Sequence, residues 1–178
     1  MKNRRSRMAR SQVALFLVCA VVGAGLALPH EAEALIRRVH ASECIVYNPH
    51  LTDVTMGTDG LKVTAPSYAA ASVYCPIPDD TYFPKTAASN VNVYGYDGHN
   101  DFGLSVITSA CVAYSGTVGW ACGTYALSGD GFTGNFDLNP GLEAWTSAYA
   151  ADFPYVLVMV PGVDGASYSY LRGIRVYD

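Results

Sequence analysis

The sequence is poor in basic residues beyond its first segment. Only six Lys and Arg follow residue 34, against thirteen Asp and Glu, so residues 35–178 carry a formal net charge of −7. Nucleic acids and anionic lipids are bound by clusters of Lys and Arg that replace their counterions. The charge balance therefore predicts that neither is a partner.

Signatures of catalytic sites are also missing. No serine lies in a G-x-S-x-G elbow, and no two cysteines have the C-x-x-C spacing of zinc and redox sites. Of the histidines after residue 34, His40 lies near the predicted cleavage site, His50 lies in a predicted turn, and His99 lies at a predicted loop tip. Asp79 and Asp80 are adjacent, whereas a glycosidase needs two carboxyls that face each other across a cleft. We expect no catalytic centre and no cofactor, and therefore not an enzyme.

The first 34 residues have the parts of a secretory signal peptide, which would form a helix. A basic start with five Lys and Arg precedes an apolar run at 13–28, and Ala-Glu-Ala at 32–34 offers a cleavage site. The run of 16 residues is shorter than the roughly 20 needed to span a bilayer. We expect cleavage after Ala34, loss of Cys19 with the peptide, and no membrane span after processing. The predicted location is secreted, periplasmic or at the cell surface.

Four cysteines remain after such a cleavage, which predicts two disulfides in an exported chain. Gly116-Thr117 suits a two-residue type II′ turn, and the two numbers of each facing pair would then sum to 233. This register pairs Val106 with Leu127, Thr108 with Tyr125, Val112 with Ala121, and Cys111 with Cys122. A Cys111–Cys122 bond follows, and Cys44–Cys75 follows by elimination.

Residues 43–178 read as a single antiparallel β-sandwich, jelly-roll-like or Ig-like, after a flexible start at 35–42. Short runs rich in Val, Tyr, Ile and Thr alternate with turn residues. The run 155–160 has no polar residue, which predicts a central strand buried on both faces. We expect residues 141–150 to form either a short helix or an irregular crossover. The expected strands are 43–47, 61–65, 72–77, 90–96, 102–115, 118–127, 155–160 and 168–177.

Two groups of residues are candidate binding sites. Asp97, His99 and Asp101 supply oxygen and nitrogen ligands at a loop tip, which suits Ca²⁺, although an ordinary polar turn uses the same residue types. Tyr94 and Tyr96 share one side of a predicted strand, which is either a ligand-binding face or the plain outer face of a sheet.

Four segments give the chain a likeness to other proteins. CPIPDD at 75–80, VYGYDGH at 93–99, SACVAYSGTVGWACG at 109–123 and SYLRGIRVYD at 169–178 resemble a loose group of small exported bacterial proteins. Members of this group are single-domain, cysteine-stapled and without assigned activity. The resemblance implies export, β structure and disulfides, and it supplies no functional residue.

The predicted function is a structural or interaction role at the cell exterior. The alternative is a module that binds carbohydrate or Ca²⁺, and a hydrolase comes third. Thirteen Tyr and two Trp could supply a platform for a polysaccharide, and a surface protein is the other partner considered. Two coplanar exposed aromatic rings would favour the carbohydrate hypothesis, and scattered rings would argue against it.

Overall fold

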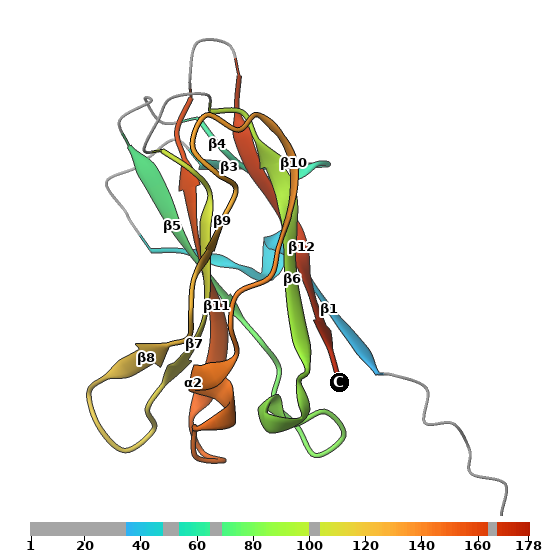
Figure 1. The fold of residues 1–178 in the computed structure, drawn as a ribbon, viewed down its shortest axis with the longest axis vertical. Helices are drawn as coiled ribbons and strands as arrows, with labels where there is room; N and C mark the ends of the chain where they lie inside the picture. The colour runs from blue at the N-terminus through green and yellow to red at the C-terminus, as the bar shows by residue number, and fades with distance from the viewer. Residues whose placement is uncertain (1–34, 48–53, 65–68, 100–103, 164–166) are drawn as a thin grey trace, which may run out of the picture. The chain divides into compact units, whose positions relative to one another are not determined.

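The computed structural model describes residues 35–47, 54–64, 69–99, 104–163 and 167–178, so the predicted signal peptide at 1–34 lies outside the described residues. Two antiparallel sheets, each of six strands, confirm the predicted β-sandwich (Figure 1). Sheet A has the order β10 (Gly134–Leu138), β6 (Asn90–Asp97), β12 (Ser169–Tyr177), β4 (Gly60–Val63) and β3 (Val54–Gly57), and β1 (Ile36–His40) also pairs with β12. Sheet B has the order β2 (Ile45–Val46), β5 (Ala70–Pro76), β11 (Phe153–Pro161), β7 (Ile107–Ala113) and β8 (Trp120–Cys122), and β9 (Ala126–Leu127) also pairs with β7.

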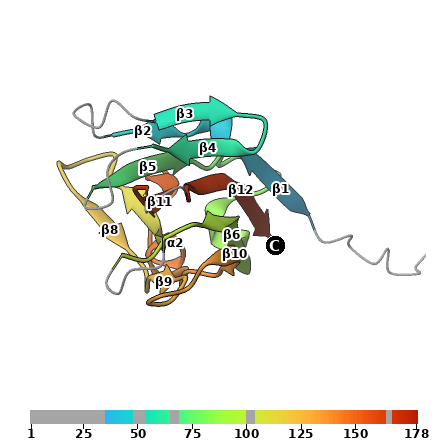
Figure 2. The same ribbon diagram turned by 90° about the horizontal axis from the view of Figure 1, so that it is seen from above.

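The two sheets pack face to face, as the view from above also shows (Figure 2). Alternate residues of each strand point inward, which puts Val91 and Val93 of β6 in one core with Val156 and Val158 of β11. All four valines are fully buried. Burial of this alternating set is what makes the sheet register specific, because a slip of one residue would expose it.

Residues 35–42 are not the flexible segment that we predicted. Strand β1 pairs along its whole length with β12, and the 3-10 turn η1 (Ala41–Glu43) follows it. Val39 is buried in the core, and Arg37 forms an ion pair with Asp80 at 2.8 Å. The ordering comes from these tertiary contacts. The sequence Ile-Arg-Arg-Val-His has too few apolar residues to show a strand by its pattern.

The run 155–160 lies in the central strand β11, as predicted, but only one of its faces is buried. Val156, Val158 and Val160 point into the core, whereas Tyr155 is half-buried and Met159 is exposed. The prediction of two buried faces is therefore wrong, because the outward-pointing residues of β11 are half-buried or exposed.

The β7–β8 turn is not of the predicted type II′. Such a turn needs a positive φ at Gly116, which is absent from the described residues with positive φ. The last ladder bond runs from the Tyr114 N–H to the Gly119 carbonyl, at 3.1 Å. Ser115 then donates its N–H to Asp152 at 3.0 Å instead of continuing the ladder.

The register of β7 is as predicted along β8 and differs by one residue along β9. Thr124 leaves the ladder between them, because its N–H and hydroxyl bond to the Glu143 carboxylate at 3.0 and 3.1 Å. Along β8 the facing pairs are Cys111–Cys122, Val112–Ala121 and Ala113–Trp120. Along β9 they are Ile107–Leu127 and Thr108–Ala126, in place of the predicted Val106–Leu127 and Thr108–Tyr125.

Both expected disulfides are present. Cys44 bonds to Cys75 with a Cα–Cα distance of 4.2 Å, and Cys111 bonds to Cys122 with 4.0 Å. Cys75 belongs to the inward-pointing residues of β5, so the first bond lies in the core. Cys111 faces Tyr155 across the ladder, so the second lies on the outer side of sheet B.

Segment 141–150 contains the one-turn helix α2 (Glu143–Thr146), which lies beside β7 at one end of the sandwich (Figure 1). Trp145 of this helix is fully buried, and its Nε1 donates a hydrogen bond of 2.7 Å to the Cys111 carbonyl. In the described part of the chain, no helix has the length and apolar character needed to cross a membrane.

Candidate functional site

Sheet B contains no charged residue in any of its six strands. The segments β2, β5, β7, β8, β9 and β11 lack Asp, Glu, Lys, Arg and His altogether. Antiparallel sheets with one solvated face ordinarily alternate apolar residues inside with polar residues outside. The outer side of sheet B does not follow this rule.

Large apolar side chains fill that outer side in neighbouring rows across the strands. Ile45, Tyr47, Trp120 and Phe153 have exposed fractions between 64% and 69%. The ten residues concerned, which we call the apolar face, are Ile45, Tyr47, Tyr74, Ile107, Trp120, Leu127, Phe153, Tyr155, Leu157 and Met159.

The tyrosines of the apolar face contact one another. The rings of Tyr47 and Tyr74 meet edge to face with centroids 5.2 Å apart, and Tyr74 stacks on Tyr155 at 5.4 Å. Burial, with a smaller contribution from Tyr74, raises the pKa of Tyr155 above its usual value. The Tyr155 hydroxyl therefore stays neutral, and the face gains no charge from it at physiological pH.

The predicted metal ligands do not form an open site. Asp97 and His99 are both buried, with 0% and 1% of their surface exposed, and Asp101 lies outside the described residues. Within the ranges that the structure describes, no three His, Cys, Asp or Glu side chains come close enough to hold one ion.

Asp97 uses both carboxylate oxygens to hold the chain together. It ends β6 on the inner side of sheet A, where an uncompensated charge would be costly. Four donors from separate positions compensate it. Oδ1 accepts from the His99 N–H at 3.0 Å and the Ser169 hydroxyl at 3.2 Å, and Oδ2 accepts from the Val106 N–H at 3.2 Å and the Ser128 hydroxyl. These bonds are those of a polar structural turn, the alternative that the sequence left open.

Tyr94 and Tyr96 lie on the outer side of sheet A and belong to cross-strand ring contacts. Tyr96 stacks on Tyr170 with centroids 5.3 Å apart and planes inclined by 15°. The Arg175 guanidinium lies 4.9 Å from the Tyr94 ring centroid. Because Tyr96 and Tyr170 cover each other's faces, they do not form the flat platform of side-by-side rings that the carbohydrate hypothesis called for.

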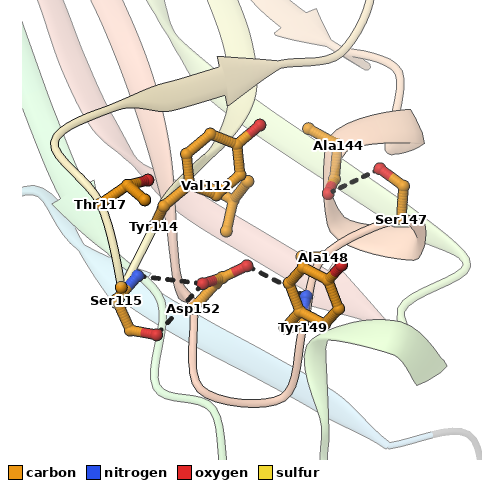
Figure 3. Close-up of a pocket in the computed structure, with 10 residues that line it drawn as sticks. Val112, Tyr114, Ser115, Thr117, Ala144, Ser147, Ala148, Tyr149 and Asp152 are labelled. Carbon is orange, nitrogen blue, oxygen red and sulfur yellow. Dashed lines mark hydrogen bonds between the residues drawn. The ribbon is translucent and has the colours of Figure 1, made fainter.

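A hollow of about 440 Å³ lies between the β7–β8 loop and α2 (Figure 3). Its acidic group, Asp152, accepts from the N–H and hydroxyl of Ser115 and from the Tyr149 N–H at 3.0 Å. The Ser115 N–H bond is the main cause that holds the pKa of Asp152 below its usual value, against the opposing effect of burial. Its carboxylate therefore links two loops, and we assign it no ligand.

The sequence analysis does not predict the apolar face, although the sequence contains a signal for it. Five segments have no charged residue at either their inward-pointing or their outward-pointing positions. They are 70–76, 107–113, 120–122, 126–127 and 153–161. Taken singly, each resembles an ordinary buried strand. Only their adjacency in one sheet shows that the uncharged residues gather on a solvent-facing side.

No protein-family model matches the chain, and no curated protein is significantly similar to it.

Proposed function

We propose that the protein is exported and acts at the cell exterior as a structural protein, without catalytic activity, whose copies join through the apolar face. The observation that carries this function is the lack of charge throughout sheet B, combined with the exposure of its outer side. Both disulfides support a location in an oxidising compartment, where such bonds persist. The signal-peptide pattern at 1–34 and the likeness to small exported bacterial proteins support the same location.

The apolar face is larger than a monomer ordinarily leaves exposed. If a large side chain has about 200 Å² of surface, the six most exposed residues present roughly 700 Å². The largest apolar patch of a typical monomer measures about 300–600 Å². A stable interface buries about 800 Å² on each partner. The half-buried residues of the apolar face add surface to that of the six most exposed residues, so the whole face can reach this area.

A second copy of the chain fits this face better than a charged partner does. A two-fold interface brings the same patch of each copy together, so the patch must be self-complementary. An uncharged face meets this condition without placing like charges opposite each other, even though residues 35–178 are acidic overall. Pairing would also bury the second side of β11, which the unbroken apolar run 155–160 predicts.

Export is tested by expressing the full chain in a secreting bacterial host and sequencing the N-terminus of the released protein. We expect the released protein to begin at Leu35, because small residues at 32 and 34 favour cleavage there. Membrane-bound protein that keeps Met1 would contradict the proposal.

Self-association is tested by sedimentation equilibrium on the released protein. We expect twice the mass of a single copy at micromolar concentrations, and a single mass for the double variant Trp120→Ser, Phe153→Ser, which places polar groups in the apolar face. The matched control is Tyr82→Ser, Tyr149→Ser, which changes two more strongly exposed aromatics outside sheet B. It should keep the double mass. A wild-type protein of single mass, or a control that dissociates equally, would refute pairing through this face.

A further inference from the structure

The outer side of sheet A gathers the basic residues that form no ion pair within the described ranges. Of the six Lys and Arg in 35–178, Arg37 and Lys85 form ion pairs with Asp80 and Asp79. The other four form no ion pair with any described carboxylate. The strand register places Arg38, Lys62 and Arg175 on one side of the sheet. Arg172, at the irregularity in β12, bonds to Asn135 on that same side. These four, which we call the basic group, are Arg38, Lys62, Arg172 and Arg175.

Tyrosine rings hold three members of the basic group in place. The Lys62 ammonium lies 3.3 Å from the Tyr168 ring centroid, and the Arg172 guanidinium lies 5.3 Å from that of Tyr170. Arg175 lies over Tyr94 in the same way, as described above. A ring attracts a cation without neutralising it. These cations therefore keep their positive charge available to a ligand.

A hollow of about 500 Å³ adjoins the basic group at the β3–β4 turn. Lys62, Tyr96 and Tyr170 line it from the strands, and Thr58 and Asp59 line it from the turn. Side chains stand roughly perpendicular to a sheet, so the stacked tyrosines direct ring edges and hydroxyls outward. The hollow thus combines positive charge with several hydroxyl groups and one carboxylate.

We infer that this hollow and the adjoining basic group bind an acidic polysaccharide. Lys62 and Arg172 suit the carboxylates of uronic acid units, and the Tyr, Thr and Asp side chains suit sugar hydroxyls. Asp59 in the hollow and Asp137, which faces Tyr94, would repel the continuous phosphates of a nucleic acid. In sugar binding, by contrast, a carboxylate such as that of Asp59 can accept hydrogen bonds from sugar hydroxyls. Because the site lies on the opposite side of the sandwich from the apolar face, it does not depend on self-association.

The test measures binding of the released protein to polygalacturonate by calorimetry, with the fully methyl-esterified polymer as an uncharged comparison. We expect binding to polygalacturonate alone, weakened by added salt. The double variant Lys62→Gln, Arg172→Gln should bind about a hundredfold more weakly, at about tenfold for each charge-assisted hydrogen bond lost.

Arg37→Gln is the control, since it removes a positive charge outside the basic group, at a residue paired with Asp80. It should bind the polymer with wild-type affinity, and circular dichroism should show that all variants are folded. Equal binding to the esterified polymer, an equal loss in Arg37→Gln, or stronger binding to single-stranded DNA would each overturn the inference. So would an absence of binding to polygalacturonate.

Discussion

Replacement of Trp145 by Ala is expected to lower the free energy of unfolding by about 4 kcal/mol, the usual cost of truncating a buried aromatic side chain. Trp145 is the largest fully buried side chain among the described residues. It belongs to α2, which packs against β7 and the 3-10 turn η2 (Lys85–Ala87). The substitution also leaves the Cys111 carbonyl without the indole donor. Since small domains are stable by only about 5–15 kcal/mol, this change consumes much of the total.

Urea unfolding of the oxidised protein, followed by far-ultraviolet circular dichroism, measures the effect. Trp145→Phe separates the contribution of ring packing from that of the hydrogen bond, because it keeps an aromatic ring and removes the indole N–H. We expect it to lower the free energy of unfolding by about 2 kcal/mol, from the smaller cavity and the lost bond together. Trp120→Ala is the matched control, since this tryptophan is exposed, and should change stability by less than about 0.5 kcal/mol when measured at concentrations where the protein is monomeric. A Trp145→Ala variant within 1 kcal/mol of wild type, a margin typical of average substitutions, would contradict the packing described.

Replacement of Asp97 by Ala should lower the free energy of unfolding by about 3–4 kcal/mol. Hydrogen bonds to a charged group contribute about 1.5–3 kcal/mol each, and buried donors left without an acceptor add a further penalty. The His99 N–H belongs to the backbone and cannot turn away as a hydroxyl can, whereas the Val106 N–H also bonds to the Ser128 hydroxyl at 3.0 Å. Asp97→Asn should lower the free energy of unfolding by less than Asp97→Ala does, because one acceptor oxygen remains. It should still destabilise the protein, because the amide NH₂ group faces hydrogen-bond donors and cannot accept from them. Asp130→Ala is the control, because Asp130 is exposed and accepts a hydrogen bond of 3.3 Å from the Ser105 hydroxyl, a weaker set of contacts among the described residues than that of Asp97.

The same unfolding measurement separates the structural role of Asp97 from the metal hypothesis. Millimolar Ca²⁺ should leave the unfolding midpoint of the wild-type protein unchanged, because the chain's own donors occupy both carboxylate oxygens. A midpoint that rises with Ca²⁺ in the wild type and not in Asp97→Asn would restore the predicted metal site.

The fold was predictable where local patterns and cysteine spacing act together. Gly116-Thr117 and the two cysteines gave the correct register beside Cys111–Cys122 even though the turn type was wrong. Register was lost at Thr124, because its bonds to Glu143 depend on a helix about twenty residues further along the chain. Strand β1 was missed for a similar reason. Its order comes from pairing with the distant β12 and not from its own sequence.

The candidate sites were harder to predict, because a side chain's role depends on what lies around it. Asp97 and His99 have the composition of a metal loop, and only their burial and hydrogen bonds show that they are structural. Conversely, Trp120 and Phe153 are of a residue type that is usually buried, and they are exposed in the fold. Tyr94 and Tyr96 were assigned correctly to one side of a strand, since that assignment needs only the two-residue period.

The opposed directions of the two outer sheet faces have a consequence for assembly. Sheets A and B form the two layers of one copy, as the view from above shows (Figure 2). Two copies joined through sheet B would therefore carry their sheet A faces at opposite ends. Such a pair is bivalent, so each end could hold a different polymer strand, and the pair would act as a cross-link in a polymer network. Retention would then rise steeply with polymer density, since a second attachment becomes effectively intramolecular once the first is made.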